Sequence, residues 1–548
     1  MKRKAITQKM VDDWVLSNPV ASFDEMYLHF CPNKLDLLPK RTVERMRERY
    51  NAAQDKVVQE DVRRPVIGGV LESPDKRRDK ASGRTFVFTS AQSNTLLHDG
   101  FYKSLLEFCA FKGAELHISR FTYNKQGLGS QNSKVGTDKS SDSDDTWFDP
   151  RIEPYVSDMA LDLTDDLVWC GELNIIPTRV DPITGFQNYT RLASCIIPHA
   201  KMFMQSVPTM KYNPAKFIYT TGAITQRNYI QKAAGQKADF HHVFGALIVE
   251  VAEDDTWWVR QINADNAGSF YDLDLHVHPV DGITDGQRVQ AVTHGDLHGN
   301  KLSNEIASAV FKEGGILDCL LPREQFFHDT VDFQPRNHHN IKDPHFLHEM
   351  YCNGTDSVRK EFEKMADFLM TDAHRDWCKS FVVVSNHDKA IDGWLRNTSA
   401  LVDPVNVKDW HWLNYKAAEA RSNGHSFQPF SFWLNTIIGE RNVAAPRPVI
   451  LEEDSSYRIL DEIEAALHGH LGPNGARGAP RNIRSAGKVN SGHTHSAGIF
   501  EGVYTAGVYG NLDMGYNKGL SSWSHSMVVT YPNAKRTILT INNGKAWR

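Results

Sequence analysis

The chain lacks long apolar segments and paired cysteines, and both absences exclude classes of protein. No run of about 20 apolar residues occurs among its 548 residues, so no membrane-spanning helix is expected. The first ten residues, MKRKAITQKM, contain no apolar stretch of the kind that directs secretion. The seven cysteines are scattered and never in CxxC spacing. This argues against a zinc ribbon or a disulfide framework and favours a reducing compartment.

Composition is otherwise ordinary, except for histidine. The chain is 41% hydrophobic and 24% charged, which is typical of globular proteins, and at roughly 100–200 residues per domain two to four domains are expected. The net charge of -5 means that the surface as a whole does not attract polyanions. Of the 24 histidines, 16 lie between His294 and His525. Because histidine is the commonest metal ligand and a general acid or base, this region is the first place to look for chemistry.

Residues 1–60 are predicted to form a helical arm. The spacing of apolar residues indicates three short helices, of which the last, Lys40–Tyr50, is basic. Three short helices with a basic third one could form a helix-turn-helix that enters a DNA groove. The alternative is a solvated arm or an oligomerisation segment. Residues 61–83 are rich in charge, proline and glycine and are interpreted as a linker.

Residues 84–283 are predicted to form a smaller α/β domain. A buried strand begins at Arg84, a helix follows over His98–Lys112, and a second strand follows over Gly113–Ile118. Further strand-like runs occur at Ala215–Thr221 and Val243–Val251. Because this region contains no glycine-rich phosphate loop, its role stays open.

From residue 284 onward, polar side chains repeatedly follow predicted strands. The strand residues 287–293 lead into HGDLHGN, residues 325–327 into HDTVDF and residues 380–384 into SNHD. HGHLGPNG and GHTH follow further along the chain. Sites in open α/β sheets form at the carboxyl ends of strands, so these side chains are expected to converge.

The converging residue types favour a metal centre. Carboxylate, imidazole and amide groups together suit Mn²⁺, Fe or Zn²⁺, and no thiolate is present. Seven or eight ligands are too many for one tetrahedral ion, and they suit two ions about 3.5–4 Å apart that share a bridging carboxylate. The candidates are Asp296, His298, Asp329, Asn386, His387, either His468 or His470, His493 and His495.

The order of these motifs resembles that of the calcineurin-like metallophosphoesterase superfamily. Its pattern is DxH, GDxxD, GNH(D/E), a lone histidine and GHxH. The corresponding residues here are Asp296–His298, Asp329–Asp332, Asn386–Asp388, His468 and His493–His495. The resemblance implies a catalytic domain over residues 284–548 with the four-layer αββα sandwich of that superfamily, an α/β (α+β) fold. His328 and Ser385 replace two motif glycines, which puts loop geometry in doubt more than ligation.

The resemblance also implies a role for each residue. Asp296, His298 and His495 would hold one divalent ion, Asn386, His468 and His493 would hold the other, and Asp329 would bridge them. Paired cations lower the pKa of bound water to roughly 7, and the resulting hydroxide would attack phosphorus. His387 would protonate the leaving oxygen, and Asp388 would orient His387. Mn²⁺ is the expected ion, with Mg²⁺, Fe or Zn²⁺ as alternatives.

Several features favour a DNA nuclease within this superfamily. The arm looks like a DNA-binding helix set, and the additional α/β domain is foreign to a minimal phosphatase. Four stretches resemble the pre-early DNA-degradation proteins of T-odd coliphages: 89–95, 240–250, 468–478 and 521–525. The resemblance implies degradation of host DNA in the bacterial cytoplasm, with DNA as partner and with homo-oligomers or other phage early proteins as further expected partners.

Two alternatives belong to other classes. One is a phosphatase or nucleotide phosphodiesterase that acts on small phosphoesters. The other is a non-catalytic DNA-binding takeover protein, against which the complete ligand set and His387 argue. Binding of a DNA substrate would weaken steeply with increasing salt. This salt dependence distinguishes a DNA nuclease from a phosphatase that acts on small phosphoesters.

Overall fold

The computed structural model describes residues 8–18, 26–27, 29, 43, 46–51, 84–123, 146–337, 340–399, 402–441 and 444–548. The chain divides into two units, Met1–Arg77 and Arg78–Arg548. In the first unit, α1 spans Gln8–Ser17 and residues 46–51 are also helical, in line with the predicted first and third helices. The predicted second helix start at residues 22–25 and the linker at 61–83 fall outside the described residues. No helix of the described segments is long and apolar enough to cross a bilayer.

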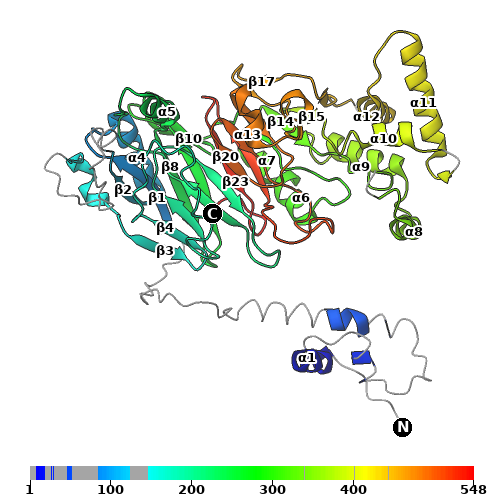
Figure 1. Cartoon of the computed structure of the whole chain (residues 1–548), viewed down its shortest axis with the longest axis horizontal. Helices are drawn as coiled ribbons and strands as arrows, with labels where there is room; N and C mark the ends of the chain where they lie inside the picture. Colours follow the sequence, from blue (N-terminus) through cyan, green and yellow to red (C-terminus); the bar gives the residue numbers. More distant parts are fainter. Residues whose placement is uncertain are drawn as a thin grey trace. The chain divides into compact units, whose positions relative to one another are not determined.

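The second unit is built on two extended layers of strands (Figure 1). One layer is a ten-stranded sheet in the order β3-β4-β5-β7-β6-β20-β21-β19-β18-β17. Its strands are β3 (Ala160–Thr164), β4 (Leu167–Cys170), β5 (Ser194–Ile197), β6 (Met204–Val207), β7 (Lys216–Thr220), β17 (Arg458–Ile459), β18 (Ile463–Glu464), β19 (Lys488–Ser491), β20 (Gly498–Phe500) and β21 (Val503–Thr505).

The other layer consists of two sheets that meet edge to edge. A four-stranded sheet has the order β2-β1-β8-β9 and a six-stranded sheet the order β16-β15-β14-β13-β22-β23. Gln261 of β9 joins them, since its side chain accepts from Ile538 N of β23 at 2.8 Å. The strands are β1 (Thr85–Gln92), β2 (Glu115–Phe121), β8 (Gly245–Val251), β9 (Trp257–Asn263), β13 (Ala291–Thr293), β14 (Glu324–His328), β15 (Lys379–Val383), β16 (Val449–Leu451), β22 (Ser526–Thr530) and β23 (Arg536–Thr540). A small sheet contains β10 (Phe270–Asp272), β11 (Leu275–His278) and β12 (Gly282–Thr284).

The first and second halves of this unit repeat one strand arrangement. β1 pairs in parallel with β2 and antiparallel with β8, which pairs antiparallel with β9. β13, β14, β22 and β23 pair in the same way. In the ten-stranded sheet, the order and directions of β3-β4-β5-β7-β6 match those of β17-β18-β19-β21-β20. The equivalent strands β6 and β20 pair antiparallel at the centre, so equivalent strand ends point to opposite edges of the sheet.

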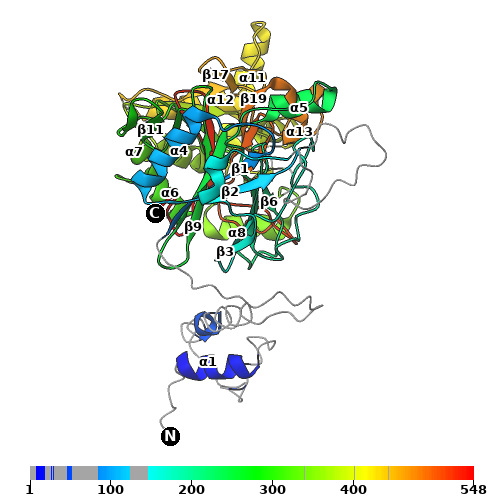
Figure 2. The same cartoon turned by 90° about the vertical axis from the view of Figure 1, so that its left-hand side faces the viewer.

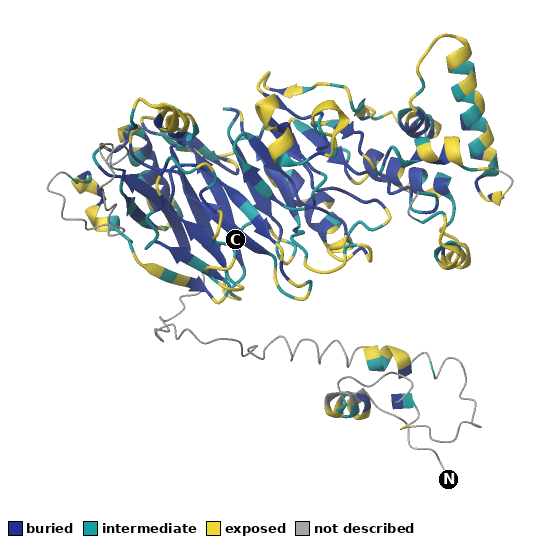
Figure 3. Cartoon of the chain, in the orientation of Figure 1, coloured by how far each residue is buried: buried dark blue, intermediate teal, exposed yellow. Residues whose placement is uncertain are grey.

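The two layers bury one apolar interior between them. Phe88 and Leu247 of the four-stranded sheet share a cluster with Trp169 and Tyr219 of the ten-stranded sheet. Val528 and Ile499 of the second half belong to the same cluster, so this core runs through both halves. Figure 3 shows that most strand residues of both layers are buried, whereas exposed residues gather on the outlying helices.

Helices cover the outer face of the layer that contains β1 and β13. α4 (Asp99–Lys112) packs Leu105 and Phe108 against Val87 and Ile248. α6 and α9 bury Val310 and Phe362 in the core of the second half. The helices of the second half are α6 (Asn304–Phe311), α7 (Ile316–Leu320), α8 (Pro344–Asn353), α9 (Val358–Met370), α10 (Ala390–Asn397), α11 (Val407–Ser422) and α12 (Pro429–Glu440). Figure 2 shows α4 and α7 on the same side of the sheets.

The outer face of the ten-stranded sheet carries little helix. Its apolar residues Cys195 and Ile218 are covered by Ile175 and Ile183, which lie in the connection between β4 and β5. In the second half, α13 (Pro480–Ile483) packs Ile483 on Val489 and Val503. The remaining short helices are α5 (Ala233–His241), η1 (Pro150–Tyr155), η3 (Pro473–Gly475) and η4 (Arg484–Ala486). The described part of the second unit is therefore mixed α/β, and loops and short helices rather than long helices cover this face of the ten-stranded sheet.

The predicted boundary between residues 283 and 284 separates two repeats of one strand arrangement, whose strands share one sheet. β6 of the first segment pairs with β20 of the second, and Asn263 Nδ2 donates to Arg536 O at 2.7 Å. That this is a domain boundary stays a prediction. Hydrogen bonds join the segments on either side of it.

Candidate metal centre

Five strand ends of the second half bring the predicted side chains to one place. Asp296 and His298 follow β13, Asp329 follows β14, and His387 follows β15. From the opposing sheet, His468 follows β18, and His493 and His495 follow β19. The candidates thus meet where the two sheets open at the carboxyl ends of their parallel strands, as predicted for an open α/β site.

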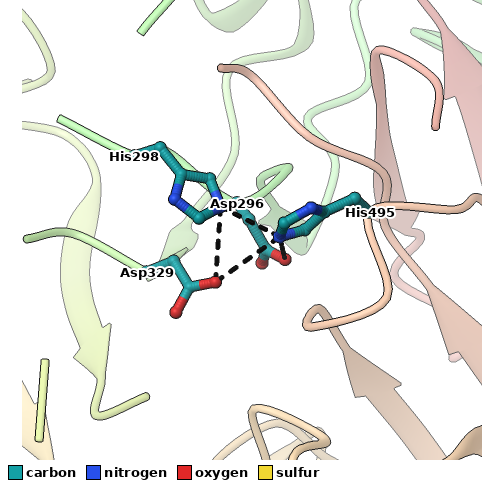
Figure 4. A group of neighbouring side chains, drawn as sticks. All are labelled: Asp296, His298, Asp329 and His495. Atoms are coloured by element: carbon teal, nitrogen blue, oxygen red, sulfur yellow. Dashed lines mark hydrogen bonds and ion pairs between the residues drawn. The ribbon is translucent and has the colours of Figure 1, made fainter. Parts of the chain in front are cut away.

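One cluster contains Asp296, His298, Asp329 and His495 (Figure 4). The Nε2 atoms of His298 and His495 lie 2.9 Å apart. His495 Nε2 is 3.3 Å from Asp296 Oδ2, and His298 Nε2 is 3.5 Å from Asp329 Oδ2. All four residues are buried. Their ligand atoms converge on one point, as expected for a divalent ion held by nitrogen and oxygen.

A second cluster shares Asp296 and adds His328 and His468. His468 Nε2 lies 3.4 Å from Asp329 Oδ1, and its Nδ1 lies 4.0 Å from Asp296 Oδ1. His328 Nδ1 is 3.3 Å from His468 Nδ1. The carboxylates of Asp296 and Asp329 therefore stand between the two clusters, which is where a bridging ligand is required.

Several ligand atoms of this site have no hydrogen-bond partner among the described residues, and this is the observation that fits a metal. Both carboxylate oxygens of Asp329, Oδ1 of Asp296 and Nε2 of His468 are buried without a hydrogen bond. Buried polar atoms normally have a partner, because desolvation without one costs about 1–3 kcal/mol or more per group. Their concentration at one point indicates that these residues could hold a divalent ion.

The electrostatics of the site also favour a bound cation. Burial and the neighbouring Asp329 carboxylate raise the pKa of Asp296 well above its usual range. Burial lowers the pKa of His298, but the carboxylates of Asp332, Asp329 and Asp296 outweigh it and raise that pKa to about 9. Burial lowers the pKa of His495 to about 4, so its imidazole is neutral near pH 7. A cation would take the place of the proton that these carboxylates attract to His298.

The backbone at the site is held in an uncommon conformation. His298, Asp329, His493 and His495 have φ values of 50°, 46°, 74° and 56°. Left-handed backbone costs non-glycine residues on the order of 1 kcal/mol each and concentrates at functional sites. The surrounding hydrogen bonds impose it; for example, His298 N donates to Asp329 O at 2.8 Å. The ligand side chains are therefore oriented by their own main chain.

Gly492 allows a test that replaces none of the candidate ligand residues. A Cβ atom at Gly492 would lie 2.1 Å from Asp296 Oδ1, so Gly492→Ala must displace that carboxylate. A displacement of about 1 Å can cost about 10²-fold in rate. We expect Gly492→Ala to weaken Mn²⁺ binding in calorimetry and to lower phosphodiesterase activity by about that factor. Gly393→Ala, in helix α10 with only Asn397 Nδ2 nearby, is the control and should change neither.

His387 lies beside the metal cluster and faces an open cleft. Its ring centre is 4.9 Å from that of His298, and its side chain is 27% exposed. The cleft has a volume of about 690 Å³, and its walls include Asn386, His387, Lys301 and Tyr516. His387 is thus accessible to a ligand and close to the cluster, as a proton donor must be.

Asp388 does not orient His387, contrary to the prediction. Its Oδ1 accepts from Thr330 Oγ1 at 2.8 Å and from Val331 N at 2.9 Å, and its Oδ2 accepts from Ser385 N at 3.1 Å. These bonds fix the loops after β14 and β15. The carboxylate that faces His387 is Asp332, whose Oδ1 lies 3.6 Å from His387 Nδ1 and 2.6 Å from His298 Nδ1. The last aspartate of the GDxxD motif, Asp332, was the available signal for this role.

The remaining candidates are placed less directly. His470 Nε2 pairs with Glu453 at 2.9 Å, whereas His468 contacts Asp329, which favours His468 as the ligand. His493 N donates to Asp296 Oδ2 at 2.7 Å, and its ring centre lies 5.2 Å from that of His468. Asn386 is exposed on the cleft wall. Neither side chain is part of the two clusters, so their ligation stays a prediction.

The first half carries different residues at the equivalent strand ends. His199 and Lys201 follow β5 at the distances at which His493 and His495 follow β19. The position equivalent to Asp296 is occupied by Ala91, since each residue lies the same distance along the chain before the N-cap of the following helix, α6 or α4. Within residues 84–123 and 146–283, no group of His, Cys, Asp or Glu is arranged to hold a metal ion. The repeated fold therefore carries one metal-type site in its described part.

Comparison with known proteins decides the family. The chain is 38% identical over 496 residues to Protein A1 of Escherichia phage T5, and the match covers 88% of this chain and 86% of that protein. The chain belongs to the Protein A1 family. Because the match spans 496 residues, the Protein A1 family shares both halves of the fold. No family model and no solved structure matches the chain, and the resemblance to the calcineurin-like superfamily stays a prediction.

Proposed function

We propose that this member of the Protein A1 family is a two-metal phosphodiesterase that cleaves DNA. The proposal rests on one observation. Buried carboxylate oxygens of Asp296 and Asp329 and the Nε2 atom of His468 converge without hydrogen-bond partners. The four-layer metallophosphoesterase arrangement is part of the proposal, with Mn²⁺ as the expected ion. Kinship with a phage protein supports an activity used during infection, with host DNA in the bacterial cytoplasm as substrate.

The side chains divide the work of binding. One ion would be held by Asp296, His298 and His495. The other ion would be held by His468, Asn386 and His493. Asp329 would contact both ions. When bound, such a pair neutralises the phosphodiester and lowers the pKa of water near phosphorus. His298 and His495 can bind at neutral pH only through a deprotonated nitrogen, and Asp332 accepts from His298 Nδ1 at 2.6 Å. This bond fixes the tautomer and turns His298 Nε2 toward the cluster.

His387 would supply the proton. Its partly exposed ring lies between the cluster and the cleft, and Asp332 faces its Nδ1. With Asp332 on the Nδ1 side of the ring, Nε2 is the nitrogen left to donate to the departing oxygen of the substrate. The alkoxide of a nucleotide sugar is a poor leaving group, so this proton matters most for a DNA substrate.

The cleft suits a polynucleotide strand. Lys301 Nζ lies 5.0 Å from the ring centre of Tyr516, which is 52% exposed, and Trp523 lies 5.8 Å from Tyr516. Cations next to accessible aromatic rings are typical of surfaces that bind single-stranded nucleic acid. Trp523 also packs at 4.3 Å on His495, so this aromatic surface adjoins the metal cluster directly.

The test uses the purified full chain with linear double-stranded, circular and single-stranded DNA. We expect cleavage with Mn²⁺, none in EDTA, and a steep decrease in DNA binding between low and physiological salt. An enzyme that leaves all three DNA forms intact with Mn²⁺ or Mg²⁺ while it hydrolyses small phosphoesters would refute the nuclease proposal. Fragments sized over time also separate cutting from ends and cutting within strands.

A further inference from the structure

A second cavity lies between the two halves at the edge of the sheet opposite the metal cluster. Its volume is about 380 Å³, and its walls include Lys201 and Phe240 of the first half and Lys488 and Tyr504 of the second. Lys201 stands at the position that His495 occupies in the second half. The cavity is therefore the first half's counterpart of the region around the metal cluster.

The walls of this cavity are strongly basic, although the chain as a whole is acidic. Its lining contains Lys201, Arg484, Lys488, Lys535 and Arg536, with Glu501 as the carboxylate among the lining residues. Glu501 is already shared between His241 at 3.9 Å and Arg484 at 3.7 Å. Lys488 pairs with Glu462, which lies outside the lining.

Three of these cations have no acidic partner. Lys201 Nζ donates to Arg179 O at 2.6 Å, and Arg536 donates to Val489 O at 2.8 Å and Gly502 O at 2.9 Å. Among the described residues, Lys201, Lys535 and Arg536 form no ion pair with a carboxylate. Lys201 and Arg536 are only 4% and 5% exposed. Burial lowers the pKa of Lys201 and Lys535, and that of Arg536 to about 10.

Two buried cations and a half-buried one with no carboxylate in contact are costly to keep charged, and a bound anion would offset that cost. Phe240 adds a second feature, because it borders the cavity with 82% of its surface exposed. An exposed aromatic ring beside phosphate-binding cations offers a stacking surface for a nucleobase. Phosphate charge and a flat aromatic ring are combined in a nucleotide.

We propose that this basic cavity binds a nucleotide unit, with its phosphate at Lys201, Lys535 and Arg536 and its base on Phe240. The unit is a free nucleoside monophosphate or the phosphorylated end of a strand. In this site the ammonium and guanidinium groups of the protein take the part that metal ions would have in the other half. Binding there requires neither a divalent ion nor hydrolysis, so the proposal does not depend on the nuclease activity.

Calorimetry of the full chain in EDTA tests it. The probes are deoxyadenosine 5′-monophosphate, deoxyadenosine, inorganic phosphate and a 5′-phosphorylated single-stranded decamer. We expect the monophosphate to bind and deoxyadenosine not to bind. Lys535→Glu should weaken binding by about tenfold or more, because a charge-assisted contact is reversed. Tighter binding of the decamer than of the monophosphate would identify a strand end as the source, and equal binding would identify the free nucleotide.

Matched variants separate this site from the metal cluster. Lys103→Glu makes the same charge change on the exposed face of α4 and should leave binding unchanged, as should Asp296→Ala. Phe240→Ser should weaken binding of the monophosphate more than that of inorganic phosphate. Arg484→Ala, at a side chain that is 47% exposed, should also weaken binding and serves if Lys535→Glu does not fold. The proposal is overturned if no probe binds in EDTA, or if Asp296→Ala abolishes binding that Lys535→Glu and Arg484→Ala leave intact.

Discussion

Asp296→Asn is expected to abolish divalent-ion-dependent hydrolysis without lowering the melting temperature of the metal-free protein. Asp296 is fully buried, and burial together with Asp329 raises its pKa, so its charge is unfavourable when no cation is present. The amide keeps the shape of the side chain and removes that charge. Several kcal/mol of transition-state stabilisation are lost with the ion, which corresponds to about 10³-fold or more in rate.

Thermal unfolding with and without Mn²⁺ measures the binding part of this prediction. A ligand that binds only the folded state raises the melting temperature by mass action. The unaltered chain should show that rise and Asp296→Asn should not. Asp274→Asn, at an exposed aspartate in the turn between β10 and β11, is the matched control and should respond to Mn²⁺ like the unaltered chain. An Asp296→Asn protein that keeps the full Mn²⁺-induced rise would show that Asp296 is not a ligand.

His387→Gln is expected to lower the rate of DNA cleavage by about 10²–10⁴-fold and to leave Mn²⁺ binding intact. That range is the usual contribution of a general acid. His387 is not among the four residues of Figure 4 and is grouped instead with His298 and Asp332, so its replacement keeps all four of those side chains. A phosphodiester with an activated aryl leaving group needs no proton, so its hydrolysis should decrease far less than that of DNA.

The ratio of the two rates is the decisive measurement. If His387→Gln slows the aryl ester and DNA equally, His387 acts on something other than the leaving oxygen. His411→Gln, at an exposed histidine of helix α11, provides the control and should leave both rates unchanged. Asp332→Asn should reproduce part of the effect, because Asp332 is the carboxylate that faces His387 Nδ1 at 3.6 Å.

Local signals in the sequence predicted local structure well. Ser303 directly precedes an apolar run at helical spacing, which is the usual sign of a helix cap, and its hydroxyl accepts from Ile306 N at the start of α6. The predicted strands at 215–221, 243–251 and 380–384 correspond to β7, β8 and β15 within one or two residues. Apolar runs and capping residues carry this information because they depend on neighbours along the chain.

Relations between distant segments were not predictable in this way. β17 and β18 contain two residues each, too few for a periodic pattern, and they form only because the sheet provides partners. The pairing of β6 with β20 leaves no mark in either segment. The resemblance assigned Asp388 to His387, whereas the carboxylate that lies 3.6 Å from His387 Nδ1 is that of Asp332. Predictions were therefore best where covalent order and spatial order agree.

The pairing of β6 with β20 has a consequence for co-translational folding. Ser206 Oγ donates to Ala497 O across this junction, although 291 residues separate them in the chain. During synthesis, β6 therefore has no partner strand on this side until β20, residues 498–500, has been made. Unpaired edges in a nascent chain invite wrong association and slow folding. Activity should consequently appear only when the last strands, β22 and β23, have left the exit tunnel.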